Sequence, residues 1–191
     1  MKLLVKSLTI VVLLSALPML TAAQKDPYGT VDTVFAEIMK IDDYNRSITI
    51  SCFNDEDVVG IAIPIHMSTG QTKVVADSAI WVGGRVENWD YKAFRPDTAI
   101  QCALIAGVAN IGPTDNVLAP GRGRLVTVFV SSTDGNKIDE FSIDTTTVAP
   151  DNSLMFVVDR YQGTPPDTVK IDFKDRQTIP AWVIRKAEST E

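Results

Sequence analysis

From Val31 onward, apolar and polar residues alternate with a period of two. The segment SITISC at 47–52 alternates isoleucine and cysteine with serine and threonine, and VVGIAIPIHM at 58–67 alternates branched residues with smaller ones. A period of two sends successive side chains to opposite faces of a β-strand. Pro64 interrupts the second segment and cannot donate to a ladder, so we expect a bulge or a free edge there. The pattern predicts half-buried strands.

Further segments of this kind follow along the chain, and Gly, Pro, Asn and Asp are frequent in the connections between them. The expected strands also include 31–41, 72–82, 89–94, 99–109, 124–132, 140–148, 154–160, 169–173 and 181–185. No window keeps a helical period for three turns. About nine to eleven short strands separated by turns indicate an all-β fold, a two-sheet β-sandwich.

The N-terminal residues have the pattern of a targeting segment. Lys2 and Lys6 precede an uncharged apolar run at 8–20, and small residues follow up to Ala23. This run is short for a membrane span and typical of a signal peptide. We expect a signal peptide over residues 1–23 and a single domain over 24–191, exported to the periplasm, the cell surface or the medium. No membrane insertion is expected after cleavage.

The charge of the chain restricts its possible partners, and its two cysteines raise the question of a disulfide. The chain carries a formal charge of −6 without a basic cluster, which argues against nucleic acid as a partner. Cys52 and Cys102 are its only cysteines, in separate apolar segments. Alternation predicts that both point inward. The sequence leaves open whether they form one bridge across the core or remain two buried thiols.

Catalytic residue types are scarce. His66 is the only histidine, on the small-residue side of its strand, and no G-x-S-x-G motif occurs. The acidic turns at 42–45 and 54–57 could offer oxygen ligands to calcium, but they lack the spacing of a calcium loop and are interpreted as solvated turns. GRGR at 121–124 lacks the end of a phosphate loop and is also interpreted as a turn. We expect no enzyme activity, no cofactor and no metal site.

The stretch WVGGRVENWDYKAFRP at 81–96 concentrates aromatic residues. If 87–94 is extended, Trp89 and Tyr91 share one side of the strand. They would then either belong to the core, the commoner place for aromatics in a sandwich, or form an exposed platform. Aromatic platforms stack on sugars and also dominate protein interfaces.

Several segments, in order, resemble the cohesin-like modules of exported bacterial proteins. They are NDEDVVGIAIPI, DSAIWVGGRVENW, IQCALIAGVA, LAPGRGRLVTVFV, IDTTTVAPDNSLMFV and IPAWVI. The resemblance spans roughly 31–184 and implies a sandwich of about nine strands with jelly-roll topology. It further implies a recognition face for a dockerin-like protein partner. Its residues would be Gly60, Ala62, His66, Trp89, Tyr91 and Gln101, with Arg85 and Glu87 at the rim.

Three functions follow as hypotheses. The first is a non-enzymatic module that assembles proteins outside the cytoplasm. The second is a carbohydrate-binding module in which Trp89 and Tyr91, with Trp81 or Trp182, stack on a polysaccharide. The third is a structural subunit of a surface layer or filament. Fold resemblance alone does not choose among them.

Overall fold

The computed structural model describes residues 26–109, 116–159, 161–162, 169–170 and 172–186. The expected signal peptide therefore lies outside the described residues. Within them the regular structure is β, apart from one 3-10 turn, η1 (Phe173–Arg176). The strands are β1 (Thr33–Lys40), β2 (Asn45–Asn54), β3 (Val58–Thr69), β4 (Val74–Ile80), β5 (Tyr91–Asp97), β6 (Cys102–Val108), β7 (Gly121–Ser132), β8 (Phe141–Thr145), β9 (Met155–Val158), β10 (Tyr161–Gln162), β11 (Val169–Lys170), β12 (Gln177–Thr178) and β13 (Ala181–Lys186).

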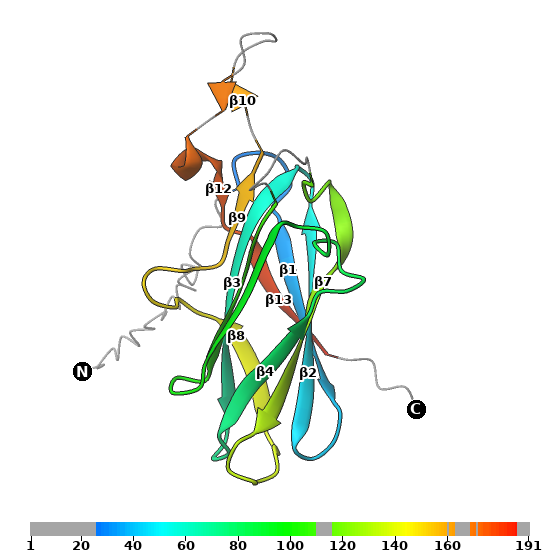
Figure 1. Cartoon of the computed structure of the whole chain (residues 1–191), viewed down its shortest axis with the longest axis vertical. Coiled ribbons are helices and arrows are strands. Elements are labelled where there is room, and N and C mark those ends of the chain that lie inside the picture. Colours follow the sequence, from blue (N-terminus) through cyan, green and yellow to red (C-terminus); the bar gives the residue numbers. More distant parts are fainter. Residues whose placement is uncertain (1–25, 110–115, 160, 163–168, 171, 187–191) are drawn as a thin grey trace, which may run out of the picture.

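Two sheets pack face to face, as Figure 1 shows. The first has the order β13-β1-β2-β7-β4, and the second has the order β12-β9-β3-β6-β5 with β8 also paired to β3. The chain passes between the sheets at β2 to β3, β3 to β4, β4 to β5, β6 to β7, β7 to β8 and β12 to β13. Such repeated crossing is the mark of a jelly-roll sandwich, so the predicted fold class is confirmed.

The alternation in β3 explains the packing of the second sheet. Ile61, Ile63, Ile65 and Met67 are buried in the core, as predicted from the period of two. The pattern changes at the start of the strand, where a bulge between Val58 and Gly60 shifts the register with β9. Because a bulge adds one residue to a strand, the side chains before it change face.

Pro64 lies where one edge of β3 changes partner. β9 pairs with β3 as far as Ala62, and β8 begins to pair at Ile65. The proline, which has no N–H, therefore occupies a gap between two partner strands, and the other edge of β3 stays paired to β6 through Leu104. The expected free edge is confirmed, but only over the short gap at Pro64 between β9 and β8.

The two ends of the described domain meet in the first sheet. β13 runs parallel to β1, with Thr33 opposite Ala181 and Ile38 opposite Lys186, so the blue and red strands lie side by side in Figure 1. A backbone hydrogen bond of 2.7 Å from Ala181 to Asp32 continues this pairing beyond β1. The fold is thereby closed by residues far apart in the sequence.

Candidate binding face

The solvent side of the second sheet carries small and apolar residues in aligned rows. Across β3, β6 and β5, Gly60 pairs with Val108 and Val108 with Tyr91. The next rows join Ala62, Ala106 and Ala93, and then Pro64, Leu104 and Arg95. We call these nine residues the outer face. Arg95 is its only charged member. Gly60, Ala62, Pro64 and Leu104 are buried, so the surface open to a partner comes mainly from Tyr91, Val108 and Arg95, which are exposed.

A shallow apolar groove deepens one end of the outer face. Its lining comprises Val59, Gly60, Ile61, Gly107, Val108, Met155, Val157, Phe173 and Arg176. Val108 is 42% exposed and Phe173 is 55% exposed, so large apolar groups stand at the groove and are open to contact. Gly60 keeps the groove open, because a Cβ atom there would lie 3.3 Å from the Val157 side chain.

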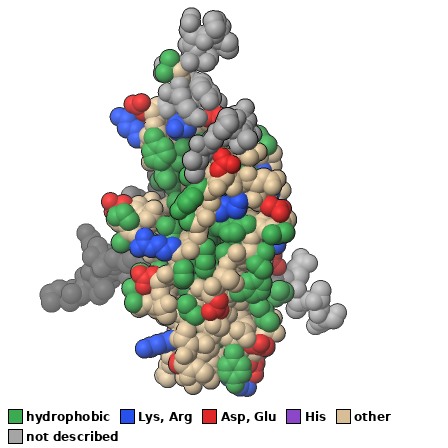
Figure 2. All heavy atoms as spheres, viewed as in Figure 1, with side chains coloured by type: hydrophobic (Ala, Val, Ile, Leu, Met, Phe, Trp, Pro, Cys, Tyr) green, Lys and Arg blue, Asp and Glu red, His purple; other side chains and the backbone are tan. Residues whose placement is uncertain are grey.

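Elsewhere the visible surface is mixed. Figure 2 shows hydrophobic side chains along the middle of the molecule, with acidic and basic side chains scattered among them. No large field of one charge sign stands out in that view.

Trp89 and Tyr91 lie on opposite sides of the second sheet, which corrects the expectation that they share one side. Trp89 is only 4% exposed and packs on Gly107, where an added Cβ would lie 2.8 Å from the indole ring. Tyr91 is 49% exposed and belongs to the outer face. The reason is local, since β5 begins only at Tyr91 and the Trp89 N–H donates to Val86 in a preceding turn.

Arg85 does not stand at the rim of the outer face. Its guanidinium donates to Asn54 Oδ1 at 2.8 Å and to the Gly121 carbonyl at 2.9 Å, on the side of the first sheet. Gly123 makes room for it, because a Cβ there would lie 2.9 Å from Arg85 Cδ. The GRGR segment is the start of β7 and not the expected turn, and Arg85 links the end of β2 to the start of β7.

Glu87 and Gln101 also make contacts within the domain. Glu87 accepts a hydrogen bond of 2.8 Å from the Gly83 N–H and so closes its own turn. Gln101 adopts a positive φ of 51°, its side chain accepts from the Val74 N–H at 3.0 Å, and its carbonyl accepts from Met67. Both residues thus have structural partners within the domain, and the recognition role that the resemblance implied stays a prediction.

His66 and the two small residues of β3 follow the expected pattern more closely. His66 is half-buried, on the same alternation as Gly60 and Ala62, and its Nδ1 lies 3.2 Å from the Ser68 hydroxyl. Gly60 and Ala62 are both on the outer face. Of the eight proposed contact residues, the structure brings Gly60, Ala62, His66 and Tyr91 to this side of the sheet.

The two cysteines are free thiols. Of the two alternatives that the sequence left open, the structure has two buried thiols and not a disulfide bridge. Cys52 lies in the core of the first sheet, and Arg85 Nη1 lies 3.1 Å from its sulfur. Burial raises the pKa of the Cys52 thiol to about 11, although Arg85 opposes the shift. Cys102 is buried outside the core cluster, on the alternation of Leu104, and does not point inward as expected.

The turn NDED contributes to an acidic cluster that the sequence did not reveal. Asp26, Asp32, Asp55 and Glu56 each offer a carboxylate oxygen within 4.8 Å of the others. Burial, with the neighbouring Asp26 carboxylate, raises the pKa of Asp32 to about 7. Burial, a hydrogen bond with Asp55 and the nearby carboxylates raise the pKa of Glu56 to about 8. The other acidic turn, at 42–45, is not part of this cluster.

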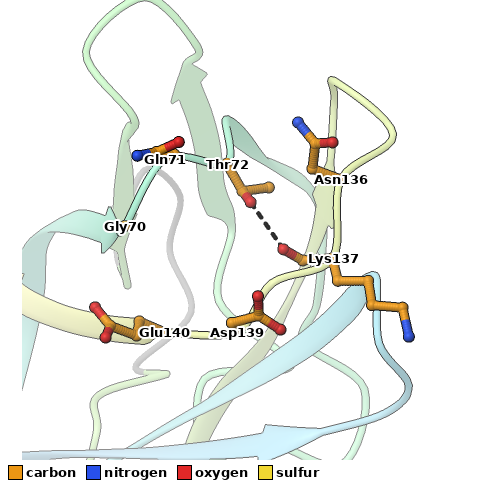
Figure 3. A pocket seen from close by; sticks show the side chains of 7 residues that line it. All are labelled: Gly70, Gln71, Thr72, Asn136, Lys137, Asp139 and Glu140. Atoms are coloured by element: carbon orange, nitrogen blue, oxygen red, sulfur yellow. Dashed lines mark hydrogen bonds between the residues drawn. The ribbon is translucent and has the colours of Figure 1, made fainter.

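A second hollow lies at one end of the sandwich, between the β3–β4 turn and the loop before β8 (Figure 3). Its lining consists of Gly70, Gln71, Thr72, Asn136, Lys137, Asp139 and Glu140. The Thr72 hydroxyl donates to the Lys137 carbonyl at 2.8 Å, and the Lys137 ammonium binds Asp43 at 2.7 Å. These contacts fasten the loop before β8.

The fold and the outer face define a jelly-roll β-sandwich that presents an apolar sheet surface. No protein-family model and no curated protein matches the chain. Among the described residues, no helix has the length and apolar character needed to cross a bilayer.

Solved cohesin domains have a similar fold. A chain of the Coh-OlpA–Doc918 type I cohesin–dockerin complex from Clostridium thermocellum is 11% identical, covering 82% of this chain and 99% of that one, with a TM-score of 0.49. The seventh ScaB type I cohesin of Pseudobacteroides cellulosolvens is 8% identical, covering 83% and 96%, with a TM-score of 0.47. A non-cellulosomal cohesin from Archaeoglobus fulgidus is 11% identical, covering 84% and 94%, with a TM-score of 0.44. This likeness concerns the fold alone.

Proposed function

We propose that this protein is an exported, non-enzymatic binding module that docks a protein partner on its outer face. The observation that carries the proposal is the apolar character of the rows that join β3, β6 and β5. Protein interfaces have cores of low charge with aromatic anchors, and Tyr91 and the groove at Phe173 supply such anchors. The sequence resemblance to cohesin-like modules makes a dockerin-like module the partner to test first.

The aromatic residues favour a protein over a polysaccharide. Stacking on sugars needs flat rings that are open to solvent. Trp89 is buried, and Trp81 and Trp182 are partly buried against the core, so Tyr91 is the one member of the predicted platform with a largely open ring. One tyrosine on an otherwise aliphatic face fits a protein contact better than a sugar platform.

The test is binding of the purified chain to a panel of purified dockerin modules and, separately, to insoluble polysaccharide. Val108→Lys places a charge in the outer face, and Tyr91→Ala removes its ring. Met39→Lys is the matched control, because Met39 is an exposed apolar residue of β1 in the other sheet.

We expect Val108→Lys to weaken partner binding by about 30-fold or more, the effect of about 2 kcal/mol at an interface hot spot. Met39→Lys is expected to leave the affinity within about twofold, as for a residue outside the interface. Full affinity in Val108→Lys would contradict the proposal, and so would retention on polysaccharide without binding to any protein of the panel. Secretion of the full chain by its host, with cleavage near Ala23, tests the export that the N-terminal sequence predicts.

A further inference from the structure

The acidic cluster lies where the segment before β1 meets the turn that joins the two sheets between β2 and β3. Asp26 and Asp32 belong to the segment that leads into β1, whereas Asp55 and Glu56 form the turn between β2 and β3. One carboxylate oxygen from each residue lies within 4.8 Å of the other three. Four groups that are negatively charged when ionised thus converge from two loops.

The backbone holds these carboxylates in place. Asp26 accepts hydrogen bonds of 3.0 Å from the Tyr28 and Asp32 N–H groups, and Asp55 Oδ2 accepts one of 2.6 Å from Thr30. Gly29 has φ +142°, and a Cβ there would lie 2.5 Å from Asp55 Oδ2. Only glycine lets the segment pass this close to the carboxylate, so the loop is shaped around the cluster.

Asp32 supplies the observation that points to a ligand. Its relative exposure is 0%, and its Oδ1 has no hydrogen-bond partner among the described residues. Its Oδ2 accepts a hydrogen bond of 3.3 Å from the Thr178 hydroxyl. A buried carboxylate oxygen without a partner is costly, and such groups are normally paired or bound to a metal.

The carboxylates of Asp26 and Asp55 lie next to that of Asp32, and besides burial both raise its pKa. Like charges at this separation repel, and a divalent cation would turn the repulsion into attraction. The competing arrangement is a set of protons shared between the carboxyl groups.

The donor atoms select the kind of cation. All four side chains offer oxygen, and neither histidine nor cysteine takes part, which favours a hard cation over zinc or copper. Calcium accepts six to eight oxygen ligands in flexible geometry, whereas magnesium demands a near-ideal octahedron. We propose that Asp26, Asp32, Asp55 and Glu56 bind a calcium ion that ties the segment before β1 to the β2–β3 turn.

The proposal is independent of the outer face and of any partner, so it can fail or succeed without affecting the proposed function. Calcium that binds only the folded chain stabilises it by mass action. At calcium 100-fold above Kd, we expect the unfolding temperature to rise by about 5–10 °C for a chain of this size.

The experiment uses the full chain, stripped of metal with a chelator that is then removed, and titrated with calcium chloride. Calorimetry is expected to give one calcium per chain, with magnesium binding much more weakly. Asp32→Asn keeps the shape of the side chain but removes its charge, and we expect it to weaken calcium binding at least tenfold. Asp43→Asn, in the exposed turn at 42–45, is the control and is expected to bind calcium as the parent chain does.

The same variants separate a metal ligand from a structural residue. Without calcium, Asp32→Asn is expected to unfold at the same or a higher temperature than the parent chain, because one repelling charge is gone. With saturating calcium, the order is expected to reverse. If Asp32→Asn fails to fold, Asp55→Asn takes its place in both measurements.

The absence of heat and of any calcium-dependent shift in the parent chain would overturn the proposal. Equal calcium affinity in the parent chain and in the aspartate variants would overturn it as well, because the ion would then bind elsewhere. Either result would leave shared protons as the arrangement that balances the carboxyl groups.

Discussion

At the scale of single residues, two aromatic side chains two positions apart have different roles. Trp89 fills the core against Gly107, whereas Tyr91 stands half open on the outer face. Truncating a buried tryptophan removes a large apolar group and leaves a cavity. An exposed tyrosine loses much less on truncation. The stability of the fold and the binding of a partner therefore depend on different rings.

We expect Trp89→Ala to lower the free energy of unfolding by about 3–5 kcal/mol. Tyr91→Ala is expected to lower it by about 1 kcal/mol or less. Urea unfolding followed by circular dichroism checks both values. Similar losses in the two variants would contradict the placement of Trp89 in the core.

Gly84 shows how tightly the turn after β4 is packed. A Cβ at this position would lie 2.2 Å from the Leu125 carbonyl oxygen and 2.8 Å from that of Trp81. Both obstacles are backbone atoms, which cannot rotate away. Gly84 thus serves close backbone approach, whereas its neighbour Gly83 supplies a positive φ of 70°.

Gly84→Ala is expected to destabilise the fold by about 2–3 kcal/mol, as overpacking does. Gly70→Ala is the matched control, since its Cβ would meet only the Glu140 carboxylate at 3.8 Å. We expect the control to change stability by about 0.5 kcal/mol or less. Thermal unfolding of the two variants measures the difference. Equal melting temperatures would refute the close contact of Gly84 with the backbone of Leu125 and Trp81.

At the scale of elements, the β1–β2 hairpin is joined to the loop before β8 through Asp43. This carboxylate lies 2.7 Å from the ammonium groups of both Lys40 and Lys137. The hydrogen bonds from Lys137 and Lys40 lower the pKa of Asp43 to about 2, from an ordinary value of 3.8. A second link in the same region is the backbone hydrogen bond from Ile138 to the Asp43 carbonyl.

Because this pKa is lowered by folding, the ionised carboxylate stabilises the fold above about pH 4. That contribution is lost as the pH falls from about 4 to about 2. Across this pH interval, we expect the urea midpoint of Asp43→Asn to fall less than that of the parent chain. Since the pair is exposed, 1 M salt is expected to reduce the difference, at a Debye length of about 3 Å. If the urea midpoints of Asp43→Asn and of the parent chain fell by the same amount across this pH interval, the ion pairs of Asp43 would be contradicted.

At the scale of the whole molecule, the two sheets hold together without a disulfide between them. Cys52 belongs to the first sheet and Cys102 to the second, and both are buried free thiols. The stability of the sandwich then depends on its apolar core and on strand pairing. The pairing of β1 with β13 joins the two ends of the described domain.

We expect two labels per chain when the protein is denatured and alkylated without reductant, read by intact mass. In the folded state, Cys52 is expected to be alkylated far more slowly than in the denatured chain, because it is buried and its pKa is raised to about 11. The outcome against the structure would be an unlabelled chain that takes up two labels only after reduction.

The sequence by itself determined the strands, the turns and the fold class. Alternation and turn residues are local properties, so strands such as β2 and β3 can be read from neighbouring residues alone. The same holds for Pro64, whose missing N–H requires a bulge or a free edge wherever the strand lies. The resemblance to cohesin-like modules added the jelly-roll topology, which the structure bears out. It implied about nine strands, whereas the described residues form thirteen, among them the two-residue strands β10, β11 and β12.

Only the tertiary structure decided which side chains meet. The burial of Trp89 depends on where β5 begins, and the separation of Cys52 from Cys102 depends on which face each strand turns to the core. The acidic cluster joins residues 26–32 to the turn at 55–56, which no spacing along the chain announces. Contacts of this kind follow from strand register and loop path, which are set by packing across the whole molecule and not by local pattern.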